Sequence, residues 1–329
     1  MEAFPIWTSS TLQTLDDVDA YYDACIGPGC HRVTPVDRQR ATPYSYCHHI
    51  ETDLLRLRIE DRRRTMTTEW QRDREQITCL IPIRGDADGA CIVDGYRLAP
   101  DRGLWIAGSG TTECFCSGDR LILAFFEYPI DIILTTTLDE DWLEGCIPFR
   151  ISQSLQEEVA RLLPKDRPPA SHVDALGHAL LECARDNGRP GEPPQTTAFN
   201  VAKAAYRVLR EEPDLAPDID ALAERVDSSR RTLEYGIRRH LGTSPGRLAK
   251  ALRLRRVLDH LQREPNETKT IAAIAREHGF HHPGHFARDY CDLFGELPHE
   301  TLRRQQQAGK RPFSYLMDQG HKPTPPSSS

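Results

Sequence analysis

The sequence contains no run of about 18 apolar residues, which is the length that a membrane-spanning helix requires. Its first residues, MEAFPIWTSSTLQTLDD, lack the basic and apolar segments of a secretory signal peptide. We therefore expect a cytoplasmic protein with no membrane partner. Ten cysteines in such a chain are expected to be mostly buried free thiols rather than a secreted disulfide framework.

The sequence also lacks several patterns that catalysis requires. Residues 50–171 contain no histidine, which nearly excludes a histidine-rich metal site in this part of the chain. No HExxH motif, glycine-rich phosphate loop or serine–histidine–aspartate arrangement can be identified. We expect no catalytic residues, no cofactor, no metal and no enzyme activity. Two short motifs, Cys47-His48-His49 and Cys114-Phe-Cys116, leave open a metal site or a thiol switch, with buried thiols as the alternative.

The charge is distributed unevenly along the chain. The net charge of the 329 residues is −7. Residues 200–329 hold 22 Lys and Arg against 17 Asp and Glu, a charge of +5, which leaves −12 for residues 1–199. A basic, histidine-rich second half is expected to meet a polyanion.

The first half is predicted to be rich in strands. Residues 1–40 are expected to be an irregular or mixed lead-in. After them, short apolar or alternating runs such as DLLRLRIE and QITCLIPI are broken by Gly, Asp and Pro, as in a barrel or sandwich. Residues 151–163 and 172–184 then have helical periodicity, and their apolar stripes could pair two chains or pack on their own domain. Five aromatic residues could line a pocket or fill the core: Trp70, Trp105, Phe115, Phe125 and Phe126.

The predicted domains follow from these changes in composition. Residues 1–150 form a β-rich domain, residues 151–185 a helical dimerisation or packing segment, and residues 186–196 a linker. Residues 197–306 form an all-α domain, and residues 307–329 are expected to be a disordered tail.

The second half contains an internal repeat. The first copy is ALAERVDSSRRTLEYGIRRHLGTSP (221–245) and the second is AIAREHGFHHPGHFARDYCDLFGELP (273–298). The copies match at a spacing of 52 residues in their first part and 53 in their second. Each is a short helix, a tight turn and a second helix, in which Ser229 is a natural N-cap and Gly242 and Gly295 are natural C-caps. This is the pattern of a helix-turn-helix motif, present twice.

A helix over residues 244–263 is predicted between the copies. A helix of twenty residues spans about 30 Å. Adjacent major-groove segments on one face of DNA lie about 34 Å apart. The spacing favours two recognition helices, at about 229–241 and 282–294, entering adjacent segments of the groove.

The two copies and the helix between them, LAERV…SSRRTLEYGIRRHLGTSP, RLRRVLDHL and IAAIAREHGFHHPGHFARDYCDLFGELP, resemble the DNA-binding domain of the AraC/XylS family of bacterial transcription regulators. The resemblance covers residues of about 199–305, and its wording is similar to the ethanolamine-utilisation regulator branch. It departs from the family at Tyr235, at Ile237 and at Thr301-Leu302. It implies an N-terminal mostly-β cupin-like barrel with helices, which senses a small molecule or mediates dimerisation, and a C-terminal all-α domain with two helix-turn-helix motifs.

Site residues follow from the two motifs. Residues at the exposed start of each second helix can reach phosphates or base edges. They are Ser229, Arg230, Arg231, Glu234, Tyr235, Arg238, His282, Gly284, His285 and Arg288. The expected core of the motifs is Leu222, Ala223, Leu233, Ile237, Ile274, Ala275, Phe280, Phe286 and Tyr290.

The histidines and two of the arginines in these motifs have alternative roles that do not involve DNA. His281 and His285 have the i, i+4 spacing of metal ligands, but Pro283 lies between them; an exposed or capping role is the other alternative. The arginines Arg238 and Arg239 could simply solvate their helix.

The predicted function is sequence-specific transcription regulation. The partners are double-stranded operator or promoter DNA, a small-molecule effector, a second copy of the chain and RNA polymerase. Two competing functions are an enzyme with an appended DNA-binding domain and an architectural DNA binder with little sequence preference.

Overall fold

The computed structural model describes residues 7–27, 29–37, 44–85, 90–118, 120–134, 140–162, 168–189, 196–212, 218–265 and 269–308. The central part of the predicted linker (190–195) and most of the predicted tail (309–329) lie outside these residues. The chain divides within one helix into two compact units, residues 1–252 and 253–329, and each is described by itself. Among the described residues, no helix is both long and apolar enough to cross a bilayer.

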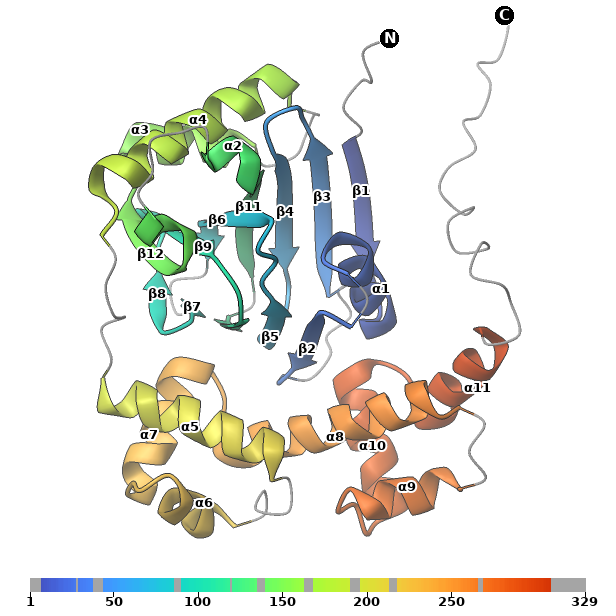
Figure 1. The fold of residues 1–329 in the computed structure, drawn as a ribbon. Helices are drawn as coiled ribbons and strands as arrows, with labels where there is room; N and C mark the ends of the chain where they lie inside the picture. The colour runs from blue at the N-terminus through green and yellow to red at the C-terminus, as the bar shows by residue number, and fades with distance from the viewer. Residues whose placement is uncertain are drawn as a thin grey trace, which may run out of the picture. The chain divides into compact units, whose positions relative to one another are not determined.

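The first 150 residues form two antiparallel sheets (Figure 1). The seven-stranded sheet has the order β1 (Trp7–Leu12), β3 (Ser45–Glu51), β4 (Arg56–Arg62), β11 (Leu121–Pro129), β6 (Gln76–Gly85), β9 (Arg102–Ala107) and β12 (Gly145–Arg150). The five-stranded sheet has the order β2 (His31–Pro35), β5 (Met66–Gln71), β10 (Thr111–Ser117), β7 (Ala90–Val93) and β8 (Tyr96–Leu98). The mostly-β first part is confirmed, and none of the described strand pairings closes the sheets into a barrel.

The helices outside the motifs are α1 (Leu15–Cys25), α2 (Ile130–Leu134), the 3₁₀ helix η1 (Glu140–Leu143), α3 (Gln153–Arg161), α4 (Ala170–Asn187) and α5 (Thr197–Glu211). The lead-in over residues 1–40, expected to be irregular or mixed, is mixed: it contains β1, α1 and β2. Thr14 and Asp17 form a capping box that starts α1, in which the Asp17 amide donates to Thr14 Oγ1 at 3.1 Å. The apolar face of α1 is buried, and β1 and β2 flank it in sequence.

The amphipathic helices α3 and α4 cover one face of the seven-stranded sheet (Figure 1). Their stripe residues Val159, Val173 and Leu180 are at most 1% exposed and pack with sheet residues such as Ile59 and Trp105. The stripes thus bury apolar surface within their own domain. Of the two alternatives that the sequence left open for these stripes, the structure shows packing on their own domain.

The opposite face of the seven-stranded sheet meets the five-stranded sheet through charged residues. Arg58, Glu60 and Arg62 alternate along β4, and all three are at most 3% exposed. Glu60 accepts hydrogen bonds from Arg62 Nε at 2.9 Å and from Tyr22 at 2.8 Å, and pairs with Arg58. Arg58 also donates to Glu127 on β11 at 2.9 Å. The interior between the sheets is therefore an ion-pair network rather than a purely apolar core.

The aromatic residues offered by the sequence serve as core. Trp105, Phe115, Phe125 and Phe126 are at most 2% exposed. One cavity between the sheets, lined by Arg58, Trp70 and Phe125 among others, holds about 30 Å³. That is space for about one water molecule.

Candidate nucleic-acid interface

Six helices follow one another in the second half of the chain (Figure 1). They are α6 (Ile219–Arg225), α7 (Arg230–Leu241), α8 (Pro245–Arg263), α9 (Ile271–Glu277), α10 (Pro283–Phe294) and α11 (Pro298–Ala308). The all-α second part is confirmed. Helices α7 and α10 begin within one residue of the predicted starts of the recognition helices.

Local capping residues position both recognition helices. Ser229 is the N-cap of α7, and its hydroxyl accepts from the Thr232 amide at 3.1 Å. His282 occupies the N-cap position of α10 without a side-chain capping bond, and Pro283 is the first helical residue. Both helices end on left-handed glycines, Gly242 with φ 64° and Gly295 with φ 82°.

The turn within each motif requires a left-handed residue. Gly279 has φ 79°, and Asp227, 52 residues earlier, has φ 49°. Aspartate tolerates this conformation better than most side chains. Asp227 was not predicted from the sequence, although it is the position equivalent to Gly279 at the 52-residue offset of the repeat.

The expected core residues of the motifs are buried, with one exception. The eight buried ones are at most 4% exposed: Leu222, Ala223, Leu233, Ile237, Ile274, Ala275, Phe286 and Tyr290. Phe280 is half-buried, with its ring centroid 5.3 Å from that of Phe286. Arg253 on α8 lies 5.0 Å above the Phe280 ring and donates to the Gly279 carbonyl at 3.3 Å. Arg253 was missed because nothing in its local sequence distinguishes it from the other arginines of α8.

The predicted contact residues of α7 differ in whether they form ion pairs within the protein. Arg230 pairs with Glu234 at 3.0 Å and with Asp220 at 3.2 Å. These carboxylates raise the pKa of Arg230 and accept hydrogen bonds from its Nε and Nη1. Within the described part of the chain, Arg231 has no ion pair and is exposed, and Tyr235 one turn later is 60% exposed. The geometry therefore presents Arg231 and Tyr235 outward, while Arg230 and Glu234 brace the helix.

The start of α10 presents a second exposed group. His282, Gly284, His285 and Arg288 are all exposed, and the rings of His282 and His285 lie 5.9 Å apart. A Cβ on Gly284 would meet no atom within 4 Å, so the backbone there is open to a close approach. These side chains can donate to phosphates or base edges.

The histidines do not converge as a metal site. Among the described residues, the one group of three or more ligand-type side chains whose donor atoms converge is Cys91, Cys114 and Cys116. His278 is half-buried, and burial, with His260 and Arg256 nearby, lowers its pKa.

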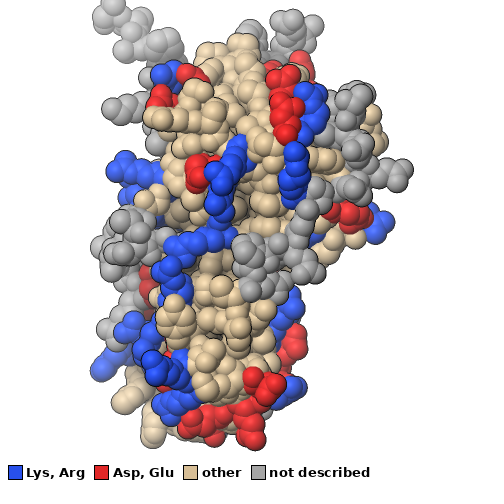
Figure 2. Space-filling view, turned by 90° about the vertical axis from the view of Figure 1, so that its left-hand side faces the viewer, with Lys and Arg blue, Asp and Glu red and all other residues tan. Residues whose placement is uncertain are grey.

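The face that contains α7 also bears much of the basic charge of this part of the chain. A groove of about 730 Å³ runs beside α7 and is lined by four arginines: Arg230, Arg231, Arg238 and Arg239. Figure 2 shows Lys and Arg side chains along one side of the lower part of this view, with acidic side chains at its foot. Such a surface attracts the phosphate backbone.

Helix α5 packs across α7 at a glycine. A Cβ built on Gly236 would lie 2.3 Å from the backbone oxygen of Ala198. We therefore expect Gly236→Ala to lower the free energy of unfolding by about 1–3 kcal/mol. This loss outweighs the gain in helix propensity of about 1 kcal/mol, because a backbone atom cannot move aside.

Urea unfolding of the full chain measures this effect. Gly246→Ala in the first turn of α8 is the matched control, since a Cβ there meets nothing within 4 Å. Equal stability of the two variants would contradict the close packing of α5 on α7.

Comparisons with known proteins agree with this architecture. Residues 222–304 match a family model described as a helix-turn-helix domain. The chain is 27% identical over 184 residues to a probable thc operon regulatory protein of Rhodococcus erythropolis, covering 54% of this chain and 52% of that protein. It is 33% identical over 88 residues to XylDLEGF operon transcriptional activator 1 of Pseudomonas putida, covering 27% of each chain.

A solved structure is also similar to part of the chain. A transcriptional regulator with an AraC-type DNA-binding domain from Chromobacterium violaceum is 29% identical, covering 32% of this chain and 93% of that one, with a TM-score of 0.30. The chain spans about half the length of the first curated relative and about a quarter of the second. Residues 222–304 of this chain therefore form a helix-turn-helix domain.

Proposed function

We propose that the protein is a sequence-specific DNA-binding transcription regulator. Helices α7 and α10 enter adjacent major-groove segments, and their outward residues read bases. One observation carries this proposal: the second helix of each repeat has an exposed group of polar side chains. They are Arg231 and Tyr235 on α7, and His285 and Arg288 on α10. Ser229, Arg230, Glu234, Arg238, His282 and Gly284 complete the proposed surface.

We further propose that the β-rich domain governs this activity through α5. Glu113 on β10 is 4% exposed and accepts two hydrogen bonds from Arg207, at 3.0 and 3.2 Å. It also forms an ion pair with Lys203 at 3.5 Å. Tyr206, 1% exposed, packs edge-on against Phe115 at 5.1 Å. Strand β10 is thus joined by buried contacts to the helix that supports α7.

A second anchor lies on β5. Glu69 accepts from Tyr206 and from Arg210, the latter at 2.8 Å. Burial raises the pKa of Tyr206, which therefore stays protonated and donates to Glu69. Effector binding or dimerisation in the β-rich domain can act on DNA affinity through these contacts. A second copy of the chain and RNA polymerase remain proposed partners.

Nuclease footprinting tests the proposal. The purified chain is placed on the DNA upstream of its own and neighbouring genes, with an excess of nonspecific competitor. We expect a discrete protected stretch. Binding that the competitor removes completely, on every fragment, would instead favour an architectural DNA binder.

A further inference from the structure

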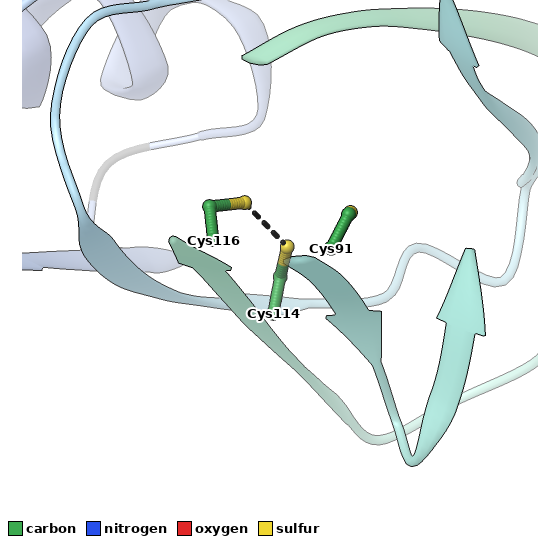
Figure 3. A group of neighbouring side chains, drawn as sticks. All are labelled: Cys91, Cys114 and Cys116. Atoms are coloured by element: carbon green, nitrogen blue, oxygen red, sulfur yellow. Dashed lines mark hydrogen bonds between the residues drawn. The ribbon is translucent and has the colours of Figure 1, made fainter. Parts of the chain in front are cut away.

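Three cysteines meet between the two sheets. Cys114 and Cys116 lie two residues apart on β10 and so share one face, and Cys91 stands opposite Cys116 on β7. The three sulfur atoms lie within 4.8 Å of one another, and those of Cys114 and Cys116 are 3.4 Å apart (Figure 3). Each residue is at most 2% exposed.

This spacing fits a bound ion. A thiolate–zinc bond of about 2.3 Å, in tetrahedral or trigonal geometry, places sulfur atoms about 3.8–4.0 Å apart. The sulfur atoms of Cys114 and Cys116 are 3.4 Å apart and the other two separations are at most 4.8 Å, so small side-chain rotations suffice.

A buried guanidinium lies beside two of the three sulfur atoms. Arg62 Nη1 lies 3.0 Å from Cys116 Sγ and 3.8 Å from Cys114 Sγ, and Arg62 is itself 2% exposed. A divalent ion with three thiolates has a net charge of −1, which an adjacent guanidinium offsets. The nearby carboxylate of Glu60 is occupied by Arg58, Arg62 and Tyr22, so the ligands on offer are sulfur. Sulfur ligands select soft ions over Mg²⁺ or Ca²⁺.

We propose that Cys91, Cys114 and Cys116 form a binding site for a thiophilic divalent cation such as Zn²⁺ or Cd²⁺, with Arg62 as the outer donor to the thiolates. On binding, each thiol loses its proton to solvent and forms a sulfur–metal bond. The metal is neither oxidised nor reduced.

The site lies on the strand that contacts the first helix-turn-helix motif. Cys114 and Cys116 face the interior, and the alternating residues Glu113 and Phe115 face α5, where they contact Arg207 and Tyr206. Because β10 bears both the sulfur ligands and the contacts to α5, we expect a cation bound on its inner face to alter the contacts on its outer face. The site itself is independent of the proposed function, whereas its effect on DNA affinity rests on it.

Cadmium binding to the reduced, chelator-treated full chain tests the site. Ultraviolet thiolate-to-cadmium absorption gives the stoichiometry, and ¹¹³Cd NMR reports the number of sulfur ligands. We expect Cys114→Ser and Cys116→Ser each to bind one ion fewer than the wild type and to lose the three-sulfur signal. Cys79→Ser is the matched control, because Cys79 is a fully buried thiol on the other face of the seven-stranded sheet.

Several outcomes would overturn the site. The first is an equal cadmium stoichiometry in Cys114→Ser and Cys79→Ser, and the second is the absence of a three-sulfur signal in the wild type. The third is a Cys91–Cys116 disulfide in the protein whose reduced thiols do not bind Cd²⁺. If circular dichroism shows that the cluster variants do not fold, the wild type alone provides the test of the site. Its melting temperature must rise with Cd²⁺ and not with Mg²⁺.

The coupling has a separate readout. Operator affinity of the wild type is expected to change by about 5- to 150-fold with Zn²⁺, the usual range for coupled sites. Cys114→Ser is expected to show no change. Cadmium binding without any change in DNA affinity would refute the coupling alone. Loss of specific DNA binding in every sample would refute the proposed function and leave the site standing.

Discussion

Replacing Arg231 and Arg288 together with alanine is expected to reduce the preference for operator over nonspecific DNA by about 2–6 kcal/mol, at about 1–3 kcal/mol for each lost base contact. Both side chains are exposed, and each lies near the start of a different recognition helix. Because the two helices are proposed to contact different segments of the groove, the two losses are expected to add. Competition binding at a fixed salt concentration measures the preference.

The control removes the same charge elsewhere. Arg225 and Arg263 are exposed arginines at the ends of α6 and α8, outside the recognition helices. Arg225→Ala with Arg263→Ala is expected to weaken binding to all sequences about equally, or not at all. A matching loss of preference in the control pair would show that Arg231 and Arg288 contribute charge and not base recognition.

Glu60→Gln is expected to lower the free energy of unfolding by about 3–5 kcal/mol, the usual cost of removing one partner from a buried ion pair. Glu60 is fully buried, and the substitution leaves the guanidinium groups of Arg58 and Arg62 inside the domain with less compensating charge. Urea unfolding measures the change. Glu75→Gln, at an exposed carboxylate, serves as the control and is expected to be nearly neutral.

The same network makes stability depend on acid. Burial opposes the charge of Glu60, but Arg62 and Arg58 outweigh it and hold the pKa of Glu60 below its ordinary value of 4.5. The stabilisation is therefore fully present above about pH 4.5 and is lost as the pH falls through the lower pKa of the folded state. Glu60→Gln should flatten this loss. A variant that kept the full wild-type dependence, or that cost less than about 1 kcal/mol, would contradict the role of the buried network.

The helical half was predictable because its signals are local. Capping residues, C-terminal glycines and the repeat set the bounds of α7 and α10 to within a residue. Ser229 and Gly242 act within a few residues of their own position. Asp227 and Arg253 were missed for different reasons. The first is visible only when the copies are aligned, and the second acts on a turn 26 residues away.

The β half shows what alternation cannot settle. DLLRLRIE predicts a strand correctly, but its charged face would ordinarily be assigned to solvent. In the structure, Arg58 and Glu60 are buried because their partners Tyr22 and Glu127 come from segments 38 and 69 residues away. In the same way, the sequence pairs Cys114 with Cys116 but gives no sign that Cys91 joins them. Only the pairing of β7 with β10 brings it there.

The most direct test of two recognition helices in adjacent groove segments is a base-substitution scan of the footprinted operator. It is measured with the wild type, Arg231→Ala and Arg288→Ala. The account predicts two blocks of base preference about 10–10.5 base pairs apart. Arg231→Ala should relax only one block and Arg288→Ala only the other. A single block, or the same positions relaxed by both substitutions, would contradict it.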